Sequence, residues 1–174
     1  MAVRKIYTFP DPVLRVKAHP ITEFGEELKA LAADMAETMY KAPGVGLAAN
    51  QIGVTKQILV YDISRAEEEP ALTVLINPEI IEAAGSEIGE EGCLSVIELC
   101  AKVKRAKMIR VHALDLDGNP ISIEAEDFHA RVLQHEIDHL NGVLFLDHLS
   151  PLKRSLYKKK LKKLLQEEQE EAAD

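Results

Sequence analysis

Two histidines four residues apart, with a glutamate directly after the first, mark residues 135–139 as the segment best suited to chemistry. In His135-Glu136-Ile137-Asp138-His139, both imidazoles lie on one face of a helix, because an α-helix has about 3.6 residues per turn. Two imidazoles so placed can bind one metal ion. Glu136, next to the first ligand, can serve as acid and base towards a water on that metal.

The rest of this predicted helix is apolar, with Val132, Leu133, Ile137 and Leu140 around the polar positions. Charged groups on a buried helix need partners, and a divalent cation supplies one. The pattern therefore favours a buried metal site over a solvated helix face that carries unrelated histidines.

The third ligand has to come from elsewhere in the chain. One class of zinc proteases places another histidine six residues after the second, where this chain has Phe145. Another class uses a glutamate on a later helix, but Glu167 and Glu168 lie in a polar tail. The remaining candidate is Cys93, in Glu91-Gly92-Cys93-Leu94-Ser95, because a thiolate is a strong and soft ligand.

Three segments resemble motifs of the peptide deformylase family, in the order that the family has them. They are Gly44-Val45-Gly46-Leu47-Ala48-Ala49-Asn50-Gln51, Glu91-Gly92-Cys93-Leu94-Ser95 and Gln134-His135-Glu136-Ile137-Asp138-His139. The resemblance extends from about residue 3 to the C-terminal helix. It implies one divalent metal on Cys93, His135 and His139, with Fe²⁺ in the cell and Zn²⁺, Ni²⁺ or Co²⁺ possible in purified protein.

The resemblance also implies an activity, the hydrolysis of the N-formyl group from the formyl-methionine of nascent polypeptides, with release of formate. Glu136 would take a proton from water and return it to the departing amine. The side-chain amide of Gln51 and the backbone N–H of Leu94 would stabilise the tetrahedral oxyanion.

Substrate binding follows from the same resemblance. The peptide backbone is expected to add as a strand, which tolerates varied downstream residues. The residues expected to hold the backbone and to border the apolar methionine pocket are Val45, Gly46, Gly92, Leu94, Val132 and the stem of Arg131.

The resemblance gives one supporting contact and two departures. Glu91 is expected to pair with Arg105 and brace the cysteine loop. Where the family usually has proline this chain has Ile97, and where many members have an arginine beside the substrate's path it has Cys100. Cys100 is expected to be a buried strand residue, and the alternative is a disulfide with Cys93 under oxidation, which would remove the metal ligand.

The elements that must position these residues follow from hydrophobic periodicity and turn residues. Helices are predicted over about 25–41 and 128–140 and from Pro151 onwards, with a frayed acidic tail over 167–174. The predicted extended segments are 57–63, 72–76, 79–84, 86–90, 108–116, 121–126 and 143–149. The prediction is an α+β fold with antiparallel strands packed around a central metal-binding helix. A single catalytic domain is expected over 1–150, followed by a basic helix with an acidic tail over 151–174.

Composition limits the remaining function classes. The chain has 174 residues, a net charge of −8 and two cysteines, which suits one globular domain of the cytoplasm without a disulfide framework. No apolar run approaches the roughly 20 residues that a membrane span needs. The negative charge also argues against broad nucleic-acid binding, so neither DNA nor a membrane is expected as a partner.

The C-terminal helix departs from this negative balance. It carries seven basic residues on or beside an apolar stripe, namely Lys153, Arg154, Lys158, Lys159, Lys160, Lys162 and Lys163. The resemblance implies that this helix contacts ribosomal RNA near the tunnel exit, mainly through phosphates. Two rival functions are a zinc endopeptidase of the His-Glu-x-x-His type and a non-catalytic, metal-stabilised ribosome-binding protein.

Overall fold

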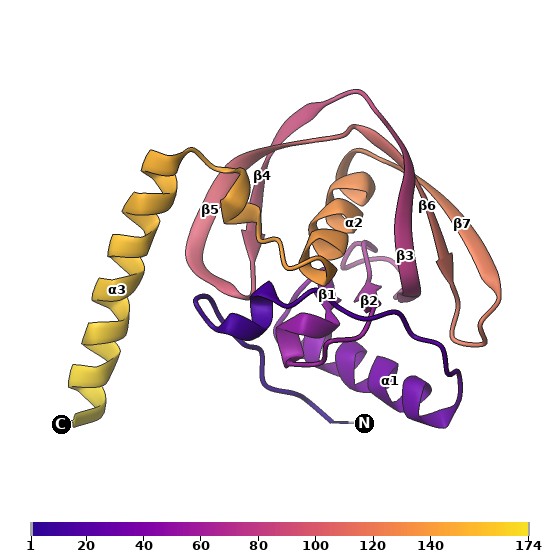
Figure 1. Cartoon of the computed structure of the whole chain (residues 1–174), viewed down its shortest axis with the longest axis horizontal. Helices are drawn as coiled ribbons and strands as arrows, with labels where there is room; N and C mark the ends of the chain where they lie inside the picture. The colour runs from indigo at the N-terminus through magenta and orange to yellow at the C-terminus, as the bar shows by residue number, and fades with distance from the viewer. Residues whose placement is uncertain (1, 174) are drawn as a thin grey trace.

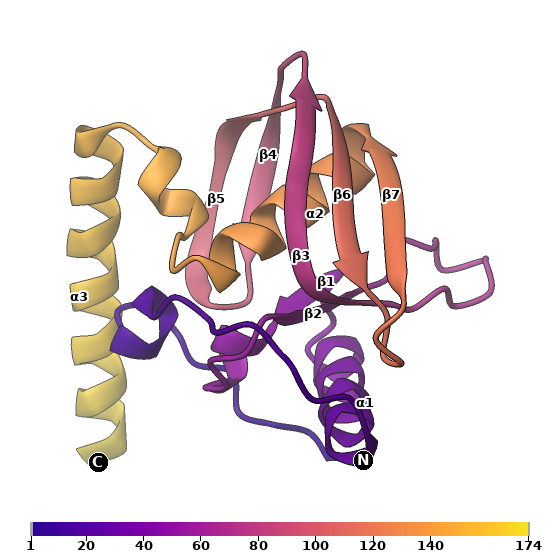
Figure 2. The same cartoon turned by 45° about the vertical axis from the view of Figure 1, so that its right-hand side comes forward.

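The computed structural model of the chain describes residues 2–173, in which two antiparallel sheets enclose one helix, α2 (Asp127–Leu140). Figures 1 and 2 show α2 between the sheets, α1 (Glu26–Lys41) against the larger sheet and α3 (Pro151–Ala173) standing at the side next to β5 (Val96–Arg105). Five strands form one sheet in the order β1-β2-β3-β6-β7, and β4 and β5 form the other. The predicted α+β architecture is therefore confirmed.

The strands and outer helices have the following bounds: β1 Gly46–Ala48, β2 Ile58–Tyr61, β3 Thr73–Ala84, β4 Glu87–Cys93, β5 Val96–Arg105, β6 Met108–Leu114, β7 Pro120–Glu126, α1 Glu26–Lys41 and α3 Pro151–Ala173. Short 3₁₀ helices cover Pro12–Arg15, Ala49–Ile52 and Phe145–His148.

Helix α2 is buried because apolar side chains occupy most of its surface. Leu133 is fully buried and packs with Leu59, Leu75 and Val111 of the five-stranded sheet. The polar residues of α2 that share this interior must therefore find partners inside the protein. On the other side of the sheet, α1 packs through a second apolar cluster that includes Met35, in agreement with the helix predicted over 25–41.

The prediction of two separate strands around Asn77-Pro78 is wrong, because β3 runs through both residues. Asn77 has φ of 51°, and its side chain bonds the backbone N–H and C=O of Ile21 at 2.8 Å each. The pairing of β3 with β6 shifts register between Ile76 and Glu79. Pro78 thus lies at a bulge, where its missing N–H does not interrupt the ladder.

β1 and β5 lie outside the predicted extended segments, and two of the predicted segments have another structure. Residues 143–149, expected to be extended, contain the 3₁₀ helix Phe145–His148, in which the Asp147 carboxylate accepts from the N–H of Leu144 at 2.9 Å. The tail expected to be frayed continues α3 as far as Ala173. Its glutamate, glutamine and alanine residues are good helix formers, which accounts for the extension.

Helix α3 is anchored through one face near its start and exposed elsewhere. Tyr157 and Leu161 are buried in a third apolar cluster with Val96 and Val103 of β5. By contrast, Leu152 is 69% exposed. Ser150 caps the N-terminus of α3, since its Oγ accepts from the N–H of Lys153 at 3.2 Å. Within residues 2–173, no helix has the length and apolar character that a membrane span requires.

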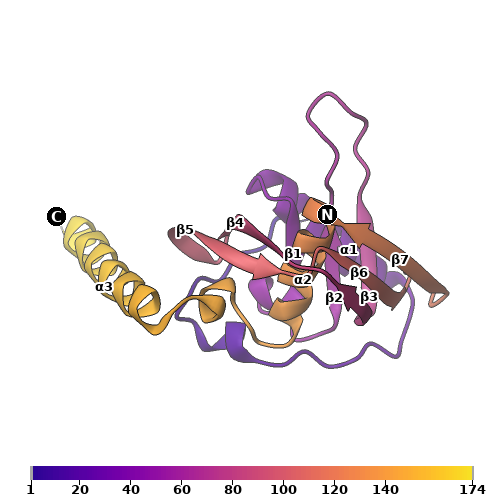
Figure 3. The same ribbon diagram turned by 90° about the horizontal axis from the view of Figure 1, so that it is seen from above.

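The loop between β2 and β3 projects from the body of the protein (Figure 3) and is fixed at its base by Asp62. Its carboxylate accepts from Tyr40 Oη at 2.6 Å, from Ser64 Oγ at 2.6 Å and from the N–H of Ala71 at 3.0 Å. Hydrogen bonds from Ser64 and Tyr40 lower the pKa of Asp62 from 3.8 to about 2.

Replacement of Asp62 by Asn is expected to lower the free energy of unfolding at pH 7 by about 1–3 kcal/mol, because an ionised acceptor of several hydrogen bonds is lost. The pKa of Asp62 is lower in the folded protein than in the unfolded chain, so its ionisation stabilises the folded parent above about pH 4. This contribution disappears as the pH falls towards 2. The free energies of unfolding of the parent and of Asp62→Asn, measured with urea between pH 7 and pH 2.5, should therefore converge as the pH falls. The exposed Asp117→Asn variant serves as control. A stability difference between the parent and Asp62→Asn that does not change with pH would contradict the stabilising role of the ionised Asp62 carboxylate.

Candidate metal centre

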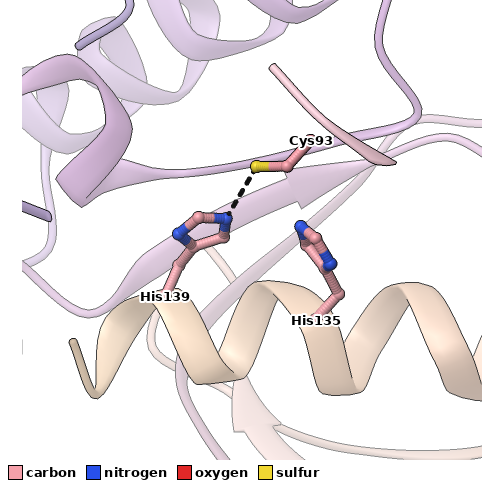
Figure 4. A group of neighbouring side chains, drawn as sticks. All are labelled: Cys93, His135 and His139. Carbon is pink, nitrogen blue, oxygen red and sulfur yellow. Dashed lines mark hydrogen bonds between the residues drawn. The ribbon is translucent and has the colours of Figure 1, made fainter. Parts of the chain in front are cut away.

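Three side chains from distant parts of the sequence meet at one point, as predicted for Cys93, His135 and His139. Their potential ligand atoms all lie within 4.8 Å of one another. Figure 4 shows both imidazoles rising from successive turns of α2 towards the thiol of Cys93. Cys93 Sγ and His139 Nε2 are 3.3 Å apart. The four-residue spacing on α2 sets the histidines, and the end of β4 supplies the sulfur.

The cysteine is held by a short turn between β4 and β5, in which Cys93 pairs with Val96. The N–H of Ser95 donates to Cys93 Sγ at 3.4 Å, and the N–H of Phe9 donates to the carbonyl of Ser95 at 2.7 Å. Gln51 approaches from the 3₁₀ helix that follows β1, and its Nε2 lies 3.0 Å from Ser95 Oγ and 3.7 Å from Cys93 Sγ. Gln51 is buried, so its amide belongs to the site rather than to a surface turn.

A buried carboxylate, Glu91, orients the first histidine. Its oxygens accept from Arg105 Nε and Nη2 at 2.9 Å each, and from Arg131 Nη1 at 2.6 Å. Glu91 Oε1 also lies 2.9 Å from His135 Nδ1. This contact leaves His135 Nε2 free to face the other ligands, which is the usual arrangement for a metal-binding histidine. The predicted pairing of Glu91 with Arg105 is confirmed.

Glu136 has a different environment, although it is the neighbour of His135. It is buried, and its Oε2 has no hydrogen-bond partner among residues 2–173. A Cβ placed on Gly46 would lie 2.8 Å from Glu136 Oε1. Glycine is therefore required at position 46 to leave room for this carboxylate beside the edge of β1.

The protein groups alone favour distinct charge states for these three α2 residues. Burial raises the pKa of Glu136 to about 7, which suits a group that takes up and releases protons near neutral pH. Burial also lowers the pKa of His139 and keeps that ring neutral, as a metal ligand must be. Burial would lower the pKa of His135 too, but its contacts with Cys93 and Glu91 prevail and raise it to about 10.

The donor set fits a divalent transition metal. Typical zinc bond lengths, about 2.3 Å to sulfur and 2.0–2.1 Å to nitrogen, place the two donors of a tetrahedral site about 3.5 Å apart. Cys93 Sγ and His139 Nε2 are separated by 3.3 Å. The contacts of His135 with Cys93 and Glu91 favour positive charge at this ring, and a bound cation would supply that charge in place of the ring proton.

A cleft opens beside Cys93 and His135, between the edge of β1 and the edge of β4. The substrate-binding residues expected from the sequence all line it, namely Val45, Gly46, Gly92, Leu94, Arg131 and Val132. Arg131, however, directs its guanidinium into the protein, where Nη2 donates to the carbonyl of Glu87 at 3.0 Å. Glu98, Leu99 and Phe128 line the cleft as well, although no motif or spacing in the sequence indicates them.

The expectation that Cys100 is buried is wrong, although it does lie in a strand. Cys100 is exposed and pairs with Gly92 across the β4–β5 hairpin. Cys93 packs instead towards the third apolar cluster, on the side of Leu99 and Ala101. Neighbouring positions in a strand point to opposite faces, so the two thiols lie on opposite sides of the hairpin. This geometry disfavours the disulfide alternative.

Comparison with known proteins gives consistent matches over nearly the whole chain. The model of the polypeptide deformylase family matches residues 3–155. Peptide deformylase of Desulfotalea psychrophila is 57% identical over 164 residues, which cover 94% of this chain and 97% of that protein. Peptide deformylase of Acidobacterium capsulatum is 49% identical over 164 residues, 94% of this chain and 96% of that protein.

Solved structures match equally well. A peptide deformylase crystal structure from Legionella pneumophila superposes with a TM-score of 0.89 at 48% identity, covering 96% of this chain and 98% of that one. The peptide deformylase from Ehrlichia chaffeensis in complex with actinonin gives a TM-score of 0.88 at 39% identity, with 94% and 98% coverage.

Replacement of Glu91 by Gln is expected to weaken metal binding by about 10- to 100-fold, because the hydrogen-bonded carboxylate that orients His135 is lost. It also removes the only carboxylate bonded to the buried Arg131 among residues 2–173 and one of the two bonded to Arg105, so the thermal midpoint should fall clearly. Competition with a metal chelator and thermal unfolding measure the two effects. Glu90→Gln, the same change on the exposed neighbour, should leave both nearly unchanged. Parent-like metal affinity in Glu91→Gln would exclude the orienting role.

Proposed function

The chain belongs to the polypeptide deformylase family, and on this premise we propose how its own residues perform the reaction. It is a metal-dependent hydrolase that removes the N-formyl group from nascent polypeptides. The observation that carries the assignment of roles is the convergence of Cys93, His135 and His139 beside a buried carboxylate, Glu136, whose Oε2 has no partner within residues 2–173. A structural metal site would not need that carboxylate.

The proposed metal ligands are Cys93, His135 and His139. A divalent metal bound there would polarise the formyl carbonyl and make a coordinated water more acidic. We propose Fe²⁺ as the metal in the cell, with Zn²⁺, Ni²⁺ or Co²⁺ able to occupy the same donors in purified protein.

Glu136 is the proposed acid and base. Burial holds its pKa at about 7, so the carboxylate can accept a proton from the attacking water and then donate it to the amine that leaves. Its position next to Gly46 puts it at the edge of the cleft, where the formyl group of a bound peptide would lie.

Gln51 and Leu94 are the proposed donors to the oxyanion that forms on the formyl carbon. The Gln51 amide is preset, because its Oε1 accepts from the N–H of Ala48 at 3.0 Å and its Nε2 points to the cysteine turn. The backbone of Leu94 belongs to the same turn. Loss of one such donor typically raises the barrier by about 3–4 kcal/mol.

The peptide is proposed to bind between two strand edges. β1 ends the order of the first sheet, and β4 pairs only with β5 within the described residues, so each presents an unpaired edge to the cleft. An extended backbone could bond to Val45 and Gly46 on one side and to Gly92 on the other. The methionine side chain would enter the apolar part formed by Val132 and the stem of Arg131.

Residues 1–150 are proposed to form the catalytic domain, and 151–174 to serve as a contact to ribosomal RNA near the tunnel exit in the cytoplasm. The basic side chains Lys158, Lys159, Lys162 and Lys163 are all exposed on α3. Lys158 and Lys162, like Lys159 and Lys163, lie four residues apart, and like charges at this spacing destabilise a helix. Their clustering is therefore better explained by a phosphate-rich partner than by helix stability.

A zinc endopeptidase is disfavoured by the side chain that replaces its third histidine. Phe145 is buried and stacks on His135 with ring centroids 5.9 Å apart. This apolar contact supports the ring of His135 and leaves the third ligand position to Cys93.

Replacement of Glu136 by Ala is expected to reduce the hydrolysis of formyl-Met-Ala-Ser by at least about 100-fold, because general acid–base catalysis is lost. Metal content should remain at the parent level, since none of the ligands changes. Formate release and metal analysis on the same sample measure both quantities. The exposed Glu79→Ala serves as control, and an unformylated peptide tests for backbone cleavage. Backbone cleavage by the parent would favour the endopeptidase.

Replacement of Lys158, Lys159, Lys162 and Lys163 together by Gln is expected to weaken co-sedimentation with ribosomes at low salt, because phosphate contacts are lost. Deletion of 151–174 is a less clean test, since it also removes the buried Tyr157 and Leu161. Hydrolysis of formyl-Met-Ala-Ser should stay nearly unchanged. Replacing Glu167, Glu168, Glu170 and Glu171 by Gln is the matched control, and unchanged sedimentation of the lysine variant would refute the contact.

A further inference from the structure

One wall of the cleft is the first half of β5, residues 96–100, here called the rim segment. Val96, Glu98, Leu99 and Cys100 all line the cleft. The rim segment directly follows the turn that carries Cys93 and Leu94. Its backbone position therefore affects the width of the cleft at the place where an extended peptide would enter.

The backbone of the rim segment has an unfavourable conformation. Glu98 has φ of 55°, in the left-handed region that residues other than glycine rarely adopt. Such residues persist where surrounding contacts hold them, and they occur most often at functional sites. The preceding residue is Ile97, at the position where the family usually has proline, so no ring restricts the backbone there.

Helix α3 supplies contacts that hold this backbone. Tyr157 Oη donates to the carbonyl of Ile97 at 2.9 Å, and Lys160 Nζ donates to the carbonyl of Glu98 at 3.1 Å. The two donors lie on one face of α3, three residues apart. They therefore bond two successive carbonyls, that of Glu98, whose backbone is left-handed, and that of Ile97 before it.

The side chain of Tyr157 is held in place by burial and by its neighbours. Its side chain is 3% exposed, and its ring lies 6.3 Å from the ring of Phe9. The N–H of Phe9 in turn donates to the carbonyl of Ser95, one residue before the rim segment. Burial raises the pKa of Tyr157 to about 12, so the phenol remains a proton donor throughout the neutral range.

We propose that Tyr157 is a positioning residue for substrate binding: through the Ile97 carbonyl, with Lys160 on Glu98, it holds the rim segment in the conformation that accepts the formyl-peptide. This inference rests on the proposed function for its kinetic consequence. It makes α3 part of the construction of the peptide site, in addition to any contact with the ribosome. Tyr157 touches no reacting atom, so its effect falls on binding rather than on the chemical step.

Replacement of Tyr157 by Phe keeps the ring in its apolar cluster and removes the hydrogen bond. KM for formyl-Met-Ala-Ser is expected to rise about 3- to 10-fold, the equivalent of one net hydrogen bond, while kcat stays within about twofold. Metal content should equal that of the parent. Hydrogen exchange of backbone amides in residues 94–100 should accelerate by about the same 3- to 10-fold, because local opening becomes easier.

Two matched controls separate this role from a general loss of stability. Tyr40→Phe also removes a phenol hydrogen bond, to Asp62, but Tyr40 does not line the cleft, and both readouts should stay at parent values. Lys160→Met, a surface change that keeps the aliphatic stem, should shift KM and exchange in the same direction as Tyr157→Phe. Lys158→Met, on an exposed position of the same helix, should shift neither.

Parent-like KM and exchange in Tyr157→Phe would overturn the proposal. A fall in kcat at constant KM, or loss of metal, would overturn it too, since the contact would then act on the cysteine turn rather than on the rim segment. If the parent itself releases no formate from formyl-Met-Ala-Ser, the proposed function fails. The exchange comparison would still decide whether Tyr157 and Lys160 hold the rim segment.

Discussion

The site depends on the way in which charge is buried around Glu91. Its carboxylate bonds two arginines and the Nδ1 of His135, all in the protein interior. Arg105 is also paired with Asp138, so the positive and negative groups of this network nearly balance. Removing either a carboxylate or an arginine of this network would leave an uncompensated buried charge, which is far more costly than a surface change. The network therefore fixes the orientation of His135, one of the proposed metal ligands, within a core that would otherwise exclude polar groups.

Glu136, the residue after His135 on α2, lies in a different electrostatic environment from Glu91. Successive residues of α2 point about 100° apart, so Glu136 faces the edge of β1 while His135 faces Glu91. Glu136 consequently receives none of the arginine contacts that stabilise Glu91 in its ionised form. The pKa of Glu91 is lowered to about 2 by Arg105 and His135 against the effect of burial, whereas burial raises that of Glu136 to about 7. Two carboxylates in one core thus take different roles, one structural and one suited to proton transfer.

The sequence predicts the histidine pair well and the rest of the site less directly. Four-residue spacing on a helix is a local property, so His135, Glu136 and His139 could be placed without tertiary information. Cys93 followed by elimination and by family resemblance, since no local rule relates it to α2. The extended segments predicted from periodicity do not include β5, although Cys100 is expected to lie in a strand and Leu99, Ala101 and Val103 alternate with polar residues. The polar positions, which include Lys102 and Lys104, make the segment as a whole weakly apolar. The Asn77-Pro78 bulge depends on the contact with Ile21, far away in sequence, and could not be predicted locally.

Helix α3 is the element that sequence patterns describe least completely. Its composition suggested a solvated basic helix, and its apolar residues did not show which of them would be buried. The packing of Tyr157 and Leu161 against β5 divides the helix into an inner face that supports the cleft wall and an outer face that displays lysines. Because Lys160 donates to a rim carbonyl, the two faces share a boundary at this residue. The backbone of residues 97 and 98 therefore lies between the proposed partner surface of α3 and the proposed peptide cleft, and α3 holds it through Tyr157 and Lys160.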